Sequence, residues 1–269
     1  MTSNSVPSSS ARAAGHAGAR GVYGFFTLAC LITWACDFPM ALALATHAAP
    51  PAYAFPLAGL GAFGPTFAAL MIAAPRHELR EVFGHWRTSP LWIAVAFFVP
   101  AALHLPATLI EVALGGRPAQ WFYPPVRAEH VAALVFFSVG EEFGWRGFAY
   151  PRLAERFGKI AGSLMLGTVW AVWHLGMLFT PEHGAPALAT LGQYVLELSL
   201  WSVVIAWFFE RGRRSMAVAI ALHAGGHLDN VFRAPESELR LRVLRLAVLL
   251  VAAAFAARGL RTKPERERG

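Results

Sequence analysis

The chain has 269 residues, of which 56% are hydrophobic and only 14% are charged, and its mean hydropathy is +0.47. Soluble domains carry roughly 25% charged residues, so this composition excludes an ordinary soluble protein. The net charge of +7 does not indicate a nucleic-acid partner, because the basic residues lie between hydrophobic runs and form no single patch.

Eight apolar runs follow a leader that is rich in Ser, Ala and Gly. Each run is continuously apolar and lacks the alternation of a transmembrane β-strand, and about 20 such residues cross a bilayer as a helix. The sequence therefore predicts an all-α polytopic bundle of about eight transmembrane helices. The runs cover approximately 22–46, 53–74, 91–114, 130–150, 159–179, 186–209, 215–232 and 241–257.

We expect a disordered N-terminal tail over residues 1–20, one transmembrane domain over 21–258 and a basic C-terminal tail over 259–269. Sixteen of the 23 basic residues fall on one side of the predicted membrane and six on the other. The positive-inside rule then places both termini in the cytoplasm, and we expect a bacterial inner (plasma) membrane. The last run is the weakest span, because its basic cluster lies on the outer side; a surface helix is the alternative.

The fourth run contains three charged residues, which are costly inside a bilayer and usually mark function or pairing. At about 100° per residue, Arg146 lies roughly 40° from Glu142 but about 140° from Glu141. The spacing predicts that Glu142 pairs with Arg146 and that Glu141 is free to act on something else. The run also has three glycines that should let neighbouring helices approach closely: Gly140, Gly144 and Gly147.

The fifth and seventh runs add further polar groups. Trp170 and His174 share a helix face at i, i+4, as do His223 and His227, and Asn230 lies about 20° from His223. Counted from the predicted cytoplasmic ends, His174 lies deeper than the other groups. Three helices thus bring carboxylate and imidazole groups into the membrane.

This combination of residue types favours hydrolysis. Glu141 with His174 is suited to general-base activation of water, and His223 with His227 could stabilise a developing oxyanion. A structural ion-pair network is the alternative for the charges of the fourth run. Four other polar residues within the predicted spans carry less weight: Asp37, His104, Glu111 and Glu197. Of these, Glu111 lies close to a membrane interface and is expected to be solvated.

Three motifs follow one another in the chain: Glu141-Glu142-x-x-x-Arg146, Trp170-x-x-x-His174 and His223-x-x-x-His227. In this order they resemble the motifs of the CPBP family of intramembrane proteases, which includes type II CAAX prenyl endopeptidases and bacteriocin-immunity (ABI) proteins. The resemblance covers about residues 138–230. It implies that Glu141 activates water with His174, and that His223 and its third-motif partner hold the oxyanion. It also implies Glu142 and Arg146 as support for the first motif. The implied partners are a peptide or protein substrate, lipidated in the prenyl endopeptidase branch, and membrane lipids.

Two positions depart from the pattern of that family. Its second motif usually begins with Phe, where this chain has Trp170, and its third usually ends with Asn or Asp, where this chain has His227. The extra imidazole opens a metal site, with Glu141, His174, His223 and His227 as candidate ligands. The cofactor therefore stays open between none and one zinc ion.

Two other classes of function are compatible with these residues. A catalytically silent membrane binding or immunity protein of the same fold is favoured by the departure at His227. A proton-coupled transporter is the weaker alternative, because Asp, Glu and His chains relay protons but the chain shows no matching halves. The sequence therefore predicts an intramembrane endopeptidase that cleaves near the cytoplasmic membrane face.

Overall fold

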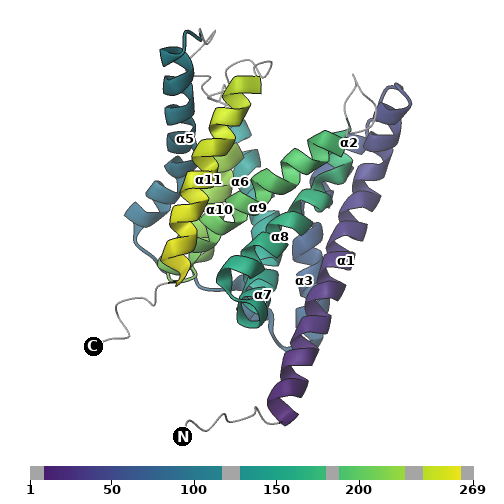
Figure 1. Ribbon diagram of the computed structural model, residues 1–269. Helices are drawn as coiled ribbons and strands as arrows, with labels where there is room; N and C mark the ends of the chain where they lie inside the picture. Colours follow the sequence, from purple (N-terminus) through teal and green to yellow (C-terminus); the bar gives the residue numbers. More distant parts are fainter. Residues whose placement is uncertain (1–8, 117–127, 180–187, 228–238, 262–269) are drawn as a thin grey trace, which may run out of the picture.

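The computed structural model describes residues 9–116, 128–179, 188–227 and 239–261, and this part of the chain is almost entirely helical (Figure 1). The helices are α1 (Ser9–Ala45), α2 (Ala54–Gly61), α3 (Gly64–Ala73), α4 (Leu79–Phe83), α5 (Pro90–Ala113), α6 (Ala128–Glu142), α7 (Tyr150–Phe157), α8 (Lys159–Trp173), α9 (Leu188–Arg211), α10 (Met216–His227) and α11 (Leu239–Arg261). The expected all-α polytopic bundle is confirmed.

The described part of each of the eight apolar runs is largely helical. Five helical segments among the described residues are long and apolar enough to cross a membrane, and a sixth results if α2 and α3, bent by 46°, form one span. The seventh run forms α10, which is shorter, and the fourth is divided between α6 and the turn that follows it. Eight crossings and cytoplasmic termini stay predictions.

Helix α1 begins at Ser9, inside the segment for which the sequence predicts a disordered tail. The cause is local composition, because the leader from Ser9 to Arg20 is rich in alanine, the strongest helix former. Residues 1–8 and the basic tail 262–269 lie outside the described part of the chain. In Figure 1, α1 starts and α11 ends at the same end of the bundle.

The charged segments that the sequence assigns to the cytoplasm meet at one end of the bundle. Arg152 of α7 donates to Glu78 at 2.6 Å, and Lys159 of α8 donates to Glu210 of α9 at 2.7 Å. The turn after α9 also joins the segment before α5, where the Met216 amide donates to the His85 carbonyl at 2.7 Å. These contacts place several predicted cytoplasmic segments side by side.

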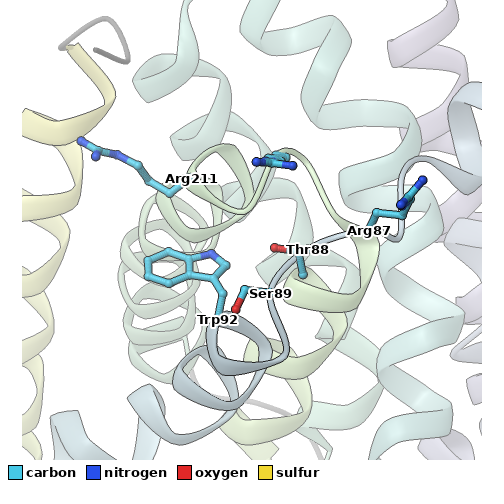
Figure 2. A pocket seen from close by; sticks show the side chains of 6 residues that line it. Arg87, Thr88, Ser89, Trp92 and Arg211 are labelled. Atoms are coloured by element: carbon cyan, nitrogen blue, oxygen red, sulfur yellow. The ribbon is translucent and has the colours of Figure 1, made fainter. Parts of the chain in front are cut away.

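Arginines frame a shallow cavity at that junction. Figure 2 shows Arg87, Thr88 and Ser89, which precede α5, and Trp92 in its first turn, together with Arg211 at the end of α9. The Trp92 indole N–H donates to the Phe208 carbonyl at 3.3 Å, which fixes α5 against α9. Basic groups clustered at one end of a bundle agree with a membrane surface at this level.

Helix α11 packs against α5 and α9, at the left of the view in Figure 1. Arg240, at its start, forms a two-pronged ion pair with Glu111 of α5, and one bond of the pair measures 2.7 Å. Glu111 is buried, so the expectation that it is solvated was wrong. Pairing explains the difference, because a neighbouring guanidinium lets a carboxylate leave water. The same pair also neutralises one of the basic residues that made the last span weak.

Candidate active site

The first motif lies where α6 passes into a π-helical turn, Phe143–Ala149. A π-helical turn holds one more residue than an α-helical turn, which changes the direction of the side chains that follow. Such turns are frequent at functional sites. Gly144 and Gly147 make the turn fit its surroundings, because a Cβ at either position would collide with the backbone of Pro65 or Val82. The predicted close approach at these glycines is confirmed.

A buried ion pair supports the motif from behind. Arg146 Nη1 donates to Glu142 Oε1 at 2.9 Å, as the i, i+4 spacing predicts, and both side chains are almost fully buried. The other end of the guanidinium reaches Ser202 Oγ of α9 at 3.5 Å. His223 Nδ1 of α10 contacts the same carboxylate oxygen at 2.8 Å. Glu142 therefore ties α6, the π turn and α10 together.

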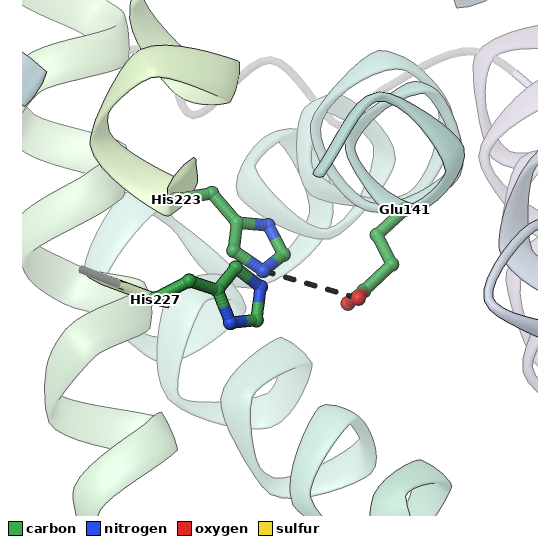
Figure 3. A group of neighbouring side chains, drawn as sticks. All are labelled: Glu141, His223 and His227. Carbon is green, nitrogen blue, oxygen red and sulfur yellow. Dashed lines mark ion pairs between the residues drawn. The ribbon is translucent and has the colours of Figure 1, made fainter. Parts of the chain in front are cut away.

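Glu141 points away from Arg146, also as predicted. Its Oε2 atom accepts hydrogen bonds from two indole N–H groups, that of Trp170 at 2.7 Å and that of Trp145 at 3.3 Å. Its Oε1 atom faces His223 Nε2 at 3.9 Å, the ion pair dashed in Figure 3. This distance is too long for a direct hydrogen bond, and a water or ion bonded to both atoms would bridge them.

The two histidines of α10 lie together, as their i, i+4 spacing predicts. Their rings stack with centroids 4.9 Å apart and an interplanar angle of 25°. One donor atom each from Glu141, His223 and His227 lies within 4.8 Å of the others (Figure 3). Glu141 and His223 are buried and His227 is half-buried.

His174 lies beside this cluster rather than in it. It follows the last residue of α8, and its Nδ1 atom lies 2.9 Å from the Trp170 carbonyl. His174, His223 and His227 all line one cavity of about 510 Å³ between α8, α9 and α10. Tyr194 of α9, which also lines this cavity, has its ring centroid 5.8 Å from that of His174. The four predicted catalytic residues are thus neighbours, with Trp170 between His174 and Glu141.

Sequence reasoning missed two contributors. Trp145 was not singled out, although it lies four residues after Glu141 within the first motif, and that spacing could have identified it. Ser202 carries no signal, because a lone serine in an apolar run usually bonds its own helix. Asn230, which helical spacing places on the face of His223 as a candidate supporting residue, lies outside the described residues.

Fold and site together define a class of protein: a multi-pass helical membrane protein in which three imidazoles line one cavity and two of them cluster with the buried Glu141 carboxylate. The model of the family described as type II CAAX prenyl endopeptidase Rce1-like matches residues 125–228, a region that contains all three motifs. The resemblance that the motifs indicate is therefore confirmed.

A curated relative supports the same conclusion. CAAX prenyl protease 2 from Methanococcus maripaludis is 23% identical to the chain over 173 residues. The aligned part is 60% of this chain and 63% of the relative, so the chain spans somewhat less than two thirds of that protein.

Proposed function

We propose that the chain is an intramembrane endopeptidase. The observation that carries this proposal is the convergence of Glu141, His223 and His227 beside a cavity that His174 also lines. A carboxylate and imidazoles beside one cavity are the groups that general-base hydrolysis requires. The match to a family of endopeptidases supports the same reaction.

The attacking water is activated by Glu141 together with His174. A carbonyl can only accept a hydrogen bond, so the contact with the Trp170 carbonyl puts the proton of a neutral His174 ring on Nδ1. Its Nε2 atom then carries a lone pair and serves as the base. The water oxygen bonds to the peptide carbonyl carbon while His174 Nε2 takes its proton. The proton passes to the departing amine nitrogen as the carbon–nitrogen bond breaks, leaving a carboxylic acid and an amine.

Without a metal ion, the His223 and His227 pair stabilises the oxyanion formed in this step. His223 does so as the imidazolium, in which Nδ1 donates to Glu142 and Nε2 donates to the oxyanion. Both rings border the cavity and lie within reach of the space beside Glu141. Stabilisation of this negative charge is the largest single contribution in many acyl-transfer enzymes. Glu142 and Arg146 keep the pair in place through the contact between Glu142 and His223.

The substrate class follows from the site's surroundings. A cavity inside a helical bundle admits an extended peptide that reaches it from the membrane, and the matched relative is named as a CAAX prenyl protease. We therefore propose a membrane-bound peptide or protein with a lipidated C-terminal segment as the substrate. Cleavage takes place near the predicted cytoplasmic face, in a bacterial inner membrane.

The test compares Glu141→Gln with the wild type in proteoliposomes. The variant retains the shape of the side chain and an acceptor for both indole N–H groups, so it should fold normally. Cleavage of a prenylated C-terminal peptide reporter should fall by at least about a hundredfold, because the Glu141 carboxylate positions and polarises the water that His174 deprotonates, and misplacing a reacting group costs about that much. The same peptide without the lipid measures the need for lipidation.

A comparison of membrane-protein C-termini in cells that express either form covers substrates unlike the reporter. If neither the reporter nor any cellular protein is cleaved in a Glu141-dependent way, the endopeptidase proposal is wrong. In that case the silent binding protein, which His227 favours, becomes the better account. A biological phenotype that survives Glu141→Gln would identify it directly.

A further inference from the structure

The Glu141, His223 and His227 cluster has the composition of a catalytic metal site. Two imidazoles and one carboxylate, with a position left open for water, are a known donor set of catalytic zinc. The three donor atoms lie within 4.8 Å of one another, whereas donors around tetrahedral zinc are about 3.4 Å apart for bonds of about 2.0–2.2 Å. Side-chain rotations that move the donors by roughly 1 Å would close this difference.

The contact between Glu142 and His223 fixes which nitrogen of His223 faces the cluster as a lone pair. Glu142 is ion-paired with Arg146 at 2.9 Å, so it acts as an acceptor, and His223 Nδ1 must donate to it. In the neutral ring Nε2 then has no proton and faces Glu141 as a lone pair, which is the form that binds a metal. Carboxylate, histidine and metal in this order are a recurring arrangement around zinc, in which the carboxylate sets the tautomer.

The two tryptophans prepare Glu141 in a similar way. Both indole N–H groups are bonded to Oε2, at 2.7 Å from Trp170 and 3.3 Å from Trp145. Oε1 is the oxygen that faces His223. One oxygen of the carboxylate is thus held by the protein while the other is directed into the cluster, as expected for a monodentate ligand.

In the described part of the chain, the negative charge of Glu141 and one nitrogen of His227 lack a partner that a cation would provide. Glu142 is ion-paired with Arg146, whereas Glu141, inside a predicted span, has no ion pair with an Arg or Lys among the described residues and contacts two indole donors and a distant imidazole. An unbalanced buried carboxylate is costly in a membrane. His227 Nε2 is also buried, and among the described residues it has no hydrogen-bond partner. One divalent ion would compensate both groups.

We propose that Glu141, His223 and His227 bind a single divalent transition-metal ion, with zinc as the preferred ion. The proposal rests on the proposed function for its role, since the ion would polarise the attacking water and stabilise the oxyanion in the site described above. The chain's own residues keep their parts: three hold the ion, Glu142 orients His223, and His174 accepts the proton.

The first measurement is metal content by mass spectrometry on the full-length protein, purified in detergent without chelator. Wild-type protein should hold about one zinc ion per chain, as for a three-ligand catalytic site. His227→Asn and Glu141→Gln should each lower the content by at least about tenfold, since even outer-shell changes cost 10–100-fold in affinity. His77→Asn is the matched control. His77 is exposed and has a left-handed backbone that Asn tolerates, so this variant should keep the metal.

A second readout follows the ion's surroundings. Wild-type protein exchanged into cobalt should show the intense visible absorption of a tetrahedral site, and His227→Asn should lose it. Melting temperatures close to that of His77→Asn confirm that each variant is folded. Wild-type protein without zinc or cobalt above the level of His227→Asn, even after incubation with excess metal, would overturn the proposal.

Activity separates this proposal from the endopeptidase proposal. Chelator-treated protein that still shows Glu141-dependent cleavage at full rate would exclude the metal site and leave the endopeptidase intact. One tightly bound zinc that His227→Asn removes, without Glu141-dependent cleavage of any substrate, would support the site and exclude the protease. Cleavage that is lost with the metal and restored by zinc supports both.

Discussion

Replacing Glu142 with Gln tests whether the buried ion pair holds the site together. The change leaves the volume of the side chain but removes the charge opposite Arg146, whose side chain is 1% exposed. The guanidinium would keep a neutral amide acceptor, the 3.5 Å contact with Ser202 and its stacking on Trp170, centred 5.0 Å away, but no ionised partner on that side. Breaking one side of a buried pair costs about 3–5 kcal/mol. We expect the free energy of unfolding to fall by this amount.

The assay is thermal unfolding of the purified protein in detergent. At about 2–4 °C per kcal/mol for a chain of this size, the melting temperature should fall by roughly 6–20 °C. Glu81→Gln is the matched control, because Glu81 also pairs with an arginine, at 3.5 Å, but is 69% exposed. Exposed pairs contribute about 0–1 kcal/mol, so the control should melt within a few degrees of wild type. Equal shifts in the two variants would refute the structural role of the buried pair.

Two further changes test the site and the last helix. Trp170→Phe removes the 2.7 Å indole bond to Glu141, worth about 1.5–3 kcal/mol for a charged acceptor, so reporter cleavage should fall about tenfold or more. Unchanged cleavage would show that Glu141 needs no such support. Glu111→Gln should loosen α11 and cost about 1 kcal/mol, because the half-exposed Arg240 can turn to solvent. Limited proteolysis near Arg240 measures this, and wild-type resistance would contradict it.

Helical periodicity was sufficient for contacts within one helix. The pairing of Glu142 with Arg146, the separate direction of Glu141 and the stacking of His223 on His227 all follow from i, i+4 spacing. The apolar runs likewise located every long helix. These features depend only on neighbours in sequence, so a single chain contains the information they need.

Contacts between helices could not be obtained in this way. Glu111 was wrongly expected to be solvated because its partner, Arg240, is 129 residues away in the sequence. The depth count put His174 below the other groups, although it lines the same cavity as His223. Such a count treats every helix as straight and upright. In the structure the first motif contains a π turn, and α8 gives way to a 3₁₀ turn at His174.

The two departures from the family pattern, Trp170 and His227, both act on the side chain of Glu141. Trp170 donates to Glu141 through a group that Phe lacks, and His227 adds an imidazole within 4.8 Å of the same carboxylate. The indole bond holds one oxygen of Glu141 while the other faces the histidines. A third ligand is useful only if the carboxylate is held in this way, and a held carboxylate gains most from a cation opposite it. We therefore expect Trp170 and His227 to act as a coupled pair. In a protein that has lost the metal through His227→Asn, adding Trp170→Phe should then change reporter cleavage little further.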